Sequence, residues 1–137
     1  MIEKFTDKEK QQLLTELLEW KEKIENKKFE IDIREFKSLC ATIFDKNSHI
    51  QFISFSLLSC TSDGIGVTDY IAFLNDKNRE VNNVDVTNDE LSTLEELTPK
   101  KYCWTKADAA DSEYSDFGYY DYKVIDRELN IQEVYVD

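Results

Sequence analysis

The first third of the chain has the spacing of apolar residues that is typical of an amphipathic helix. The apolar positions are Leu13, Leu14, Leu17, Leu18 and Ile24. Thr-Asp-Lys-Glu at residues 6–9 is a capping box, in which a hydroxyl and a carboxylate satisfy free N–H groups at the start of a helix. Asn-Lys-Lys at residues 26–28 suits a helix end, where cations complement the helix dipole. We predict a helix over residues 7–26.

A second apolar face of helical period follows a short interval. It consists of Phe36, Leu39, Cys40, Ile43 and Phe44. The sequence Asp-Ile-Arg-Glu at residues 32–35 again has the composition of a capping box, which predicts a helix over residues 33–46. Because only a few residues separate the two predicted helices, we expect them to form an antiparallel hairpin.

The period changes to two after His49. Residues 50–58 are rich in β-branched and aromatic side chains, which predicts a strand covered on both faces. Turn residues at 61–66 lead to a second predicted strand over 67–74. A hairpin turn then leads to a weaker third strand over 80–86.

The last part of the chain begins with a third capping box, which predicts a short helix over residues 88–97. Residues 101–105 have the composition of a further strand, and residues 106–116 that of a loop. Residues 117–125 and 131–136 are predicted to form a terminal β-hairpin.

This order of elements predicts an α+β fold in a single domain that spans residues 1–137. We expect an N-terminal antiparallel helix pair packed on one face of a mostly antiparallel sheet. The sheet is predicted to have five or six strands, with one short helix between strands.

The charge of the chain is unevenly distributed. The 137 residues include 17 Lys+Arg and 29 Asp+Glu, a net charge of −12. Residues 1–60 hold 10 basic and 11 acidic residues, whereas residues 61–137 hold 7 and 18 and carry a net charge of −11. Such a balance argues against direct binding of nucleic acid, because contacts to phosphates need Lys and Arg.

Acidic residues and tyrosines alternate most densely in residues 107–122, which contain no Lys or Arg. Tyrosine is frequent at interface hot spots, and carboxylates speed encounter with a cationic partner. We therefore predict a surface that binds a basic protein, formed by Asp108, Asp111, Glu113, Tyr114, Asp116, Tyr119, Tyr120, Asp121 and Tyr122. The alternative is an ordinary acidic loop before an edge strand whose tyrosines pack into the core.

Few residues in the sequence suggest catalysis. His49 is the one histidine, and it stands at a predicted helix-to-strand junction where a turn or capping role suffices. Cys40, Cys60 and Cys103 are widely spaced and odd in number, which favours free thiols in a reducing compartment. The carboxylates near Asp111 do not have the spacing of a calcium-binding loop. We expect no metal, no cofactor and no enzymatic activity.

Size, charge and the lack of a catalytic motif favour a cytoplasmic inhibitor with no membrane segment. Bacterial immunity proteins, which block a cognate toxin such as a nuclease with a basic substrate groove, have this profile. One alternative is a DNA mimic that inhibits a nucleic-acid enzyme. Another is a small enzyme that uses carboxylates as acid and base.

Overall fold

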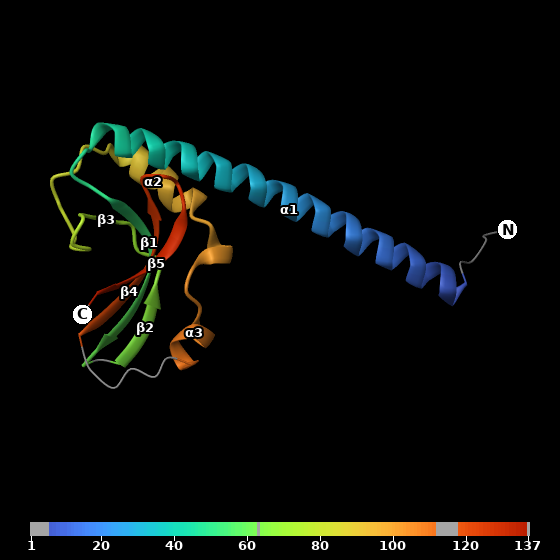
Figure 1. The fold of residues 1–137 in the computed structure, drawn as a ribbon. Helices are drawn as coiled ribbons and strands as arrows, with labels where there is room; N and C mark the ends of the chain where they lie inside the picture. The colour runs from blue at the N-terminus through green and yellow to red at the C-terminus, as the bar shows by residue number, and fades with distance from the viewer. Residues whose placement is uncertain (1–5, 63, 112–117, 137) are drawn as a thin grey trace.

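A computed structural model describes residues 6–62, 64–111 and 118–136, which form an α+β fold (Figure 1). One long helix leads into a five-stranded antiparallel sheet, and shorter helices lie between strands. The elements in chain order are α1 (Asp7–Lys46), β1 (Phe52–Thr61), β2 (Gly64–Thr68), β3 (Ala72–Leu74), α2 (Asn88–Leu97), the 3-10 helix η1 (Lys100–Tyr102), α3 (Lys106–Asp111), β4 (Tyr119–Asp126) and β5 (Ile131–Val136).

The N-terminal part of the chain is one helix of 40 residues, so the predicted antiparallel helix pair is wrong. The helix begins as predicted, because the Thr6 hydroxyl accepts a hydrogen bond from the Glu9 N–H at 3.2 Å. The expected break fails because residues 27–32 contain neither Gly nor Pro, and their Lys and Glu residues favour helix. The capping-box composition at residues 32–35 therefore lies inside a continuous helix.

The first half of α1 projects away from the rest of the molecule (Figure 1). Every residue from 7 to 28 is exposed, whereas the buried residues of α1 all lie between Phe36 and Phe44. We call residues 7–28 the arm and the described residues from 29 onwards the head. Within the described ranges, no helix is long and apolar enough to cross a membrane.

The sheet is built around β1, which pairs with three other strands. The order is β2-β1-β4-β5, and β3 also pairs with β1. β2 lies along the second half of β1 and β3 along its first half, and all pairs are antiparallel. The pairing of β1 with β4 shifts register between Ser54 and Ser56, which marks a bulge. The predicted first strand and terminal hairpin are thereby confirmed.

Three of the predicted strands differ from the observed structure. The single strand predicted over residues 67–74 is divided into β2 and β3. The strand predicted over 80–86 is reduced to one bridge, between Leu74 and Glu80. Its sequence, Glu-Val-Asn-Asn-Val-Asp-Val, is rich in Asn and Asp, which disfavour strands. Residues 101–105 contribute to η1 and irregular backbone instead of a strand.

The short helix α2 confirms the prediction from its capping box. The Thr87 hydroxyl accepts from the Glu90 N–H at 3.1 Å, and the Glu90 carboxylate accepts from the Thr87 N–H at 3.0 Å. The same carboxylate accepts from Lys46 Nζ at 2.7 Å, which ties α2 to the end of α1. The helix α3 was not predicted; it lies in the expected loop 106–116, of which residues 112–117 are outside the described ranges.

The core lies on both faces of the sheet. The larger cluster joins α1 and α2 to β1 and includes Phe36, Ile43, Phe55, Leu94 and Ile125. The smaller cluster includes Leu74, Tyr122, Val124 and Val134. Neighbouring strand residues such as Val124 and Ile125 belong to different clusters because successive side chains point to opposite faces.

The end of α1 is fastened to the sheet by two buried polar contacts. The Asn47 amide donates to the carbonyls of Ile43 and Asp85 at 2.8 and 2.9 Å, and its oxygen accepts from the Asp85 N–H at 2.6 Å. Arg127, in the β4–β5 turn, donates to the carbonyls of Phe44, Asn47 and Ile50. These bonds join the last turn of α1, through the carbonyls of Ile43 and Phe44, to the backbone of Asp85 and to the β4–β5 turn.

Candidate partner-binding site

The predicted partner-binding residues lie around α3 and β4. Asp108 and Asp111 belong to α3, whereas Tyr119 and Tyr120 begin β4. Tyr120 is exposed and pairs across the sheet with Ser59 and Val136. The predictions for Glu113, Tyr114 and Asp116 lie outside the described residues.

Two of the predicted contact residues point into the protein. Asp121 is 1% exposed and Tyr122 is 8% exposed. Tyr122 packs in the smaller core cluster with Val124 and Val134, as the core-packing alternative expected for tyrosines of this segment. Neither side chain offers a surface to a partner in this structure, because both are buried.

Asp108 takes part in the N-terminal cap of α3. Its carboxylate accepts hydrogen bonds from the N–H and the hydroxyl of Thr105, at 2.7 and 2.9 Å. The Asp108 N–H donates to the Thr105 hydroxyl at 3.2 Å, which completes a reciprocal cap. The bonds from the backbone and the hydroxyl of Thr105 lower the pKa of Asp108. The residue remains exposed and charged, so it also contributes to the field outside.

A cluster of charged and aromatic side chains surrounds Lys123 on β4. Its ammonium group forms an ion pair with Glu133 of β5 and lies 4.3 Å from the centre of the Trp104 ring. The other oxygen of the Glu133 carboxylate accepts from the Tyr135 hydroxyl at 2.7 Å. We call Asp108, Lys123, Glu133 and Tyr135 the Lys123 cluster.

The members of the Lys123 cluster act on one another electrostatically. Hydrogen bonds from Lys123 and then from Tyr135 lower the pKa of Glu133, and the charge of Asp108 opposes this effect. The bond to Glu133 raises the pKa of Tyr135, and the charge of Asp121 adds to this rise. The cluster therefore holds two carboxylates, Asp108 and Glu133, and one ammonium group, which gives it a net charge of −1.

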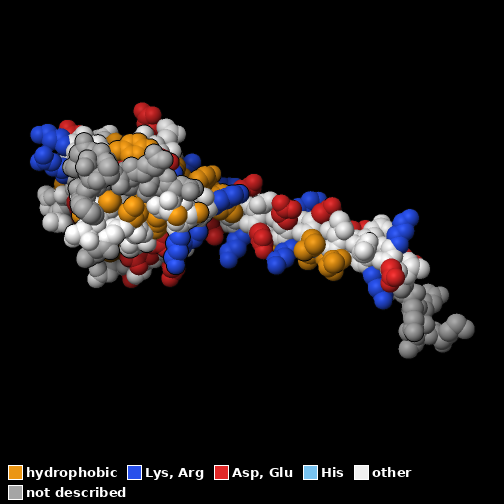
Figure 2. Space-filling view, turned by 90° about the horizontal axis from the view of Figure 1, so that it is seen from below, with side chains coloured by type: hydrophobic (Ala, Val, Ile, Leu, Met, Phe, Trp, Pro, Cys, Tyr) orange, Lys and Arg blue, Asp and Glu red, His pale blue; other side chains and the backbone are white. Residues whose placement is uncertain are grey.

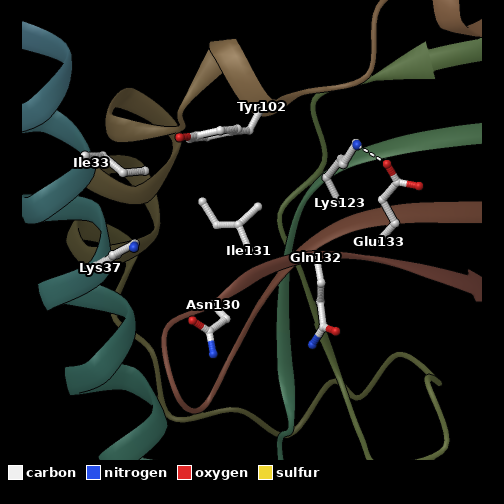
Figure 3. A pocket seen from close by; sticks show the side chains of 8 residues that line it. All are labelled: Ile33, Lys37, Tyr102, Lys123, Asn130, Ile131, Gln132 and Glu133. Atoms are coloured by element: carbon white, nitrogen blue, oxygen red, sulfur yellow. Dashed lines mark hydrogen bonds and ion pairs between the residues drawn. The ribbon is translucent and has the colours of Figure 1, made fainter. Parts of the chain in front are cut away.

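A pocket of about 400 Å³ adjoins the cluster, between α1 and the β4–β5 hairpin (Figure 3). Ile33 and Ile131 form its apolar part, and Tyr102 of η1 lies across from them. The ion pair of Lys123 with Glu133 stands at another side (Figure 3). Lys37 of α1 also lines the pocket, so its charged lining residues are two lysines and one glutamate. Such a pocket suits an uncharged side chain of a partner protein.

The sequence prediction missed Glu133, Tyr135 and Tyr102. Tyr135 is 63% exposed, more than the described tyrosines of the predicted segment. The alternation of β5 does contain the signal, because Glu133 and Tyr135 share the face opposite the buried Val134. Pairing of β5 with β4 then brings Glu133 opposite Lys123, which a scan of local composition cannot detect.

The remaining candidates for chemistry have structural surroundings. His49 bonds through Nε2 to the Asn83 carbonyl at 2.8 Å. Cys40, Cys60 and Cys103 are free and buried, and burial raises the pKa of the Cys40 thiol to about 12. In the part of the chain that the structure describes, no group of three or more His, Cys, Asp or Glu residues could hold a metal ion.

Three carboxylates of the head have lowered pKa values. They are Glu90, Asp108 and Glu133, so each stays ionised at neutral pH and is poorly suited to act as a general acid. The negative charge around the exposed Tyr135 can attract a cationic surface, and the adjoining pocket is open to an uncharged side chain. Comparison of the chain with protein-family models, with curated proteins and with solved structures finds no match.

Proposed function

We propose that this chain is an acidic protein-binding inhibitor, an immunity protein that neutralises a basic toxin domain such as a nuclease. The Lys123 cluster carries the proposal, because it combines negative charge with the exposed ring of Tyr135 beside a pocket. Aromatic side chains of this kind are common interface anchors, and carboxylates around them attract a cationic groove.

The number and the internal contacts of the basic side chains in residues 61–137 support the same proposal. This part of the chain has 7 Lys+Arg against 18 Asp+Glu. Lys100 and Lys123 form ion pairs within the head, and Arg127 is bound to backbone carbonyls. Some of the positive side chains are therefore bound within the head. The excess of carboxylates then determines the electrostatic field around this part of the chain.

The proposed partner is a basic protein domain, met in the cytoplasm and without direct contact of this chain with nucleic acid. The test is to search the genes beside that of this chain for a basic toxin domain and to measure the binding of such a domain by calorimetry. Absence of such a gene contradicts the proposal. Changing Asp111, Glu113 and Asp116 to Lys is expected to weaken binding by about a hundredfold or more, because a steering field is replaced by repulsion. The matched control reverses three charges on the arm, at Glu19, Glu22 and Glu25, and is expected to leave affinity nearly unchanged.

A second variant tests the described part of the surface. Tyr135→Ala is expected to weaken binding at least tenfold, as truncation of an aromatic anchor does. Leu18→Ala, which removes a large apolar side chain of similar exposure from the arm, serves as its control. Equal effects of the head and arm variants, or no binding of the adjacent basic domain, contradict the proposal.

A further inference from the structure

The arm exposes a row of large apolar side chains that the head does not cover. Figure 2 shows the arm extending beyond the head, with hydrophobic atoms exposed among charged side chains on the face it draws. Their spacing alternates between four and three residues, which averages to the 3.5-residue period of a two-helix coiled coil. Scattered exposed apolar residues are common, but a row at this period is typical of a helix that packs on another helix. The row consists of Leu13, Leu17, Trp20 and Ile24 on the arm, and it continues seven residues later at Ile31, at the start of the head.

The arm carries no net charge, in contrast to the rest of the chain. Residues 7–28 contain six Asp+Glu and six Lys. Residues 7–19 have a net charge of −2 and residues 20–28 a net charge of +2. Neither a basic partner nor an anionic membrane surface is selected by such a neutral helix. Its best electrostatic complement is the same helix in the reverse direction.

We propose that the arm pairs with the arm of a second copy of this chain in an antiparallel two-helix coiled coil. In the register that the row favours, Leu17 of one copy packs against Trp20 of the other, and Leu13 packs against Ile24. Two-fold symmetry repeats each of these contacts. This inference concerns assembly and does not depend on the function proposed for the head.

Charges beside the row fix the direction of the pairing. In the antiparallel register, Glu16 of each copy faces Lys23 of the other, and Asp7 faces Lys28. A parallel pair in the same heptad frame places Lys23 beside Lys28 of the other copy, a like-charge contact. In the antiparallel register Glu9 of each copy faces Glu30 of the other, so each copy has two attractive contacts and one repulsive contact. The parallel pair has one of each, Glu16 with Lys21 and Lys23 with Lys28, so the balance of charges favours the antiparallel direction.

The shape of the molecule agrees with the antiparallel direction. An arm of 22 residues is about 33 Å long. Because the head sits at one end of the arm (Figure 1), antiparallel pairing places the two heads at opposite ends. Parallel pairing crowds both heads at the same end. In the antiparallel register Lys10 of each copy faces Lys27 of the other near the ends of the row, where their ammonium groups can reach water. The parallel direction also pairs lysine with lysine at these positions, so they do not distinguish the two directions.

The first test uses sedimentation equilibrium to compare variants at two neighbouring leucines of the arm. Leu17 and Leu18 are 61% and 59% exposed, but Leu17 lies in the row and Leu18 lies outside it. We expect twice the mass of one chain for the unchanged protein at about 100 μM, where a dimer with a micromolar Kd is populated. Leu17→Glu is expected to raise the dimer Kd by about a hundredfold or more, because it buries a charge, and Leu18→Glu to leave it nearly unchanged.

The second test identifies the direction. Glu16→Lys and Lys23→Glu are each expected to weaken an antiparallel dimer about tenfold, since each replaces two attractive contacts with repulsive ones. The double variant, Glu16→Lys with Lys23→Glu, restores opposite charges and is expected to restore dimerisation. In a parallel dimer Lys23→Glu strengthens association instead, because it then faces Lys28.

Several results would overturn this inference. They are a single-chain mass for the unchanged protein, equal effects of Leu17→Glu and Leu18→Glu, and failure of the double charge swap to restore the dimer. Co-sedimentation of the arm with vesicles of mixed phosphatidylcholine and phosphatidylserine, lost in Leu17→Glu, would point to a lipid surface as the occupant. Circular dichroism of each variant checks that the helix and sheet of the head remain folded.

Discussion

Removal of the Arg127 side chain is expected to cause a large loss of stability. Its guanidinium donates to the carbonyls of Asn47 at 3.0 Å, Ile50 at 2.7 Å and Phe44 at 2.9 Å. It also lies 5.2 Å from the centre of the Phe44 ring. The side chain thus joins the C-terminal end of α1 to the β4–β5 turn, and we predict that Arg127→Ala loosens this junction.

The magnitude follows from the partners of the guanidinium. A hydrogen bond with one charged partner contributes about 1.5–3 kcal/mol, but such contributions are not additive. The Phe44 and Asn47 carbonyls also accept from backbone N–H groups, and the site is only partly buried, so water replaces part of the loss. We therefore expect about 3 kcal/mol in total, a large fraction of the about 5–15 kcal/mol typical of a domain.

The assay is urea unfolding followed by circular dichroism. With a slope of about 1.5 kcal/mol per molar urea, the midpoint for Arg127→Ala falls by about 2 M. Arg127→Lys keeps the charge but loses the planar fork, so its midpoint is expected between the two. Arg79→Ala, at an exposed arginine, is the control and is expected to change stability by less than about 0.5 kcal/mol. An equal, small effect of Arg127→Ala and Arg79→Ala would refute the reasoning.

Three further predictions concern the junction and the core. Asn47→Ala removes bonds to Ile43 and Asp85 from a side chain that is almost fully buried, and we expect urea unfolding to show a loss of about 2–3 kcal/mol. The hydrogen bond from Lys46 lowers the pKa of Glu90, so Glu90 stabilises the fold above its unfolded pKa of about 4.3, and this stability is lost as the pH falls through its folded pKa. In Glu90→Gln we expect the unfolding midpoint to fall less between pH 7 and pH 3 than in the unchanged protein. The Cys40 thiol, with a pKa of about 12, is expected to react with a disulfide reagent at pH 8 only after unfolding; labelling of the native chain at this position would contradict its burial.

Local sequence signals succeeded where the structure follows from neighbouring residues. The capping box at residues 87–90 identified α2, because both of its reciprocal hydrogen bonds form. The same composition at residues 32–35 failed, because nothing before it stops α1. A capping motif predicts a helix start only where the preceding residues leave the helical conformation. Neither Gly nor Pro is present in residues 27–32 to make them do so.

The candidate site was harder to predict because pairing between distant strands creates it. The composition of residues 107–122 drew attention to Asp121 and Tyr122, which the sheet buries. Glu133 and Tyr135 stand outside that segment and join it through the pairing of β4 with β5. The alternation of a strand separates its two faces, but it does not say which face the rest of the fold covers.

The arm illustrates another limit of the sequence pattern. Its apolar spacing correctly predicts an amphipathic helix. The predicted antiparallel hairpin has the helix over residues 33–46 cover the apolar face of this helix. The continuous helix removes that intramolecular partner, so the apolar row is left exposed on the arm. The pattern therefore identified an apolar surface correctly. The predicted partner was residues 33–46 of the same chain, whereas we propose the arm of a second copy.

Calorimetry with the basic toxin domain encoded beside the gene is the most direct test of the proposed function. We predict binding whose Kd rises steeply with salt, because exposed charges are screened over about 10 Å at 0.1 M ionic strength. We also predict that reversing Asp111, Glu113 and Asp116 abolishes most of the affinity, while reversing Glu19, Glu22 and Glu25 does not. Absence of binding, or binding that ignores both salt and the charge reversal in the head, would contradict the assignment of this chain as an acidic inhibitor.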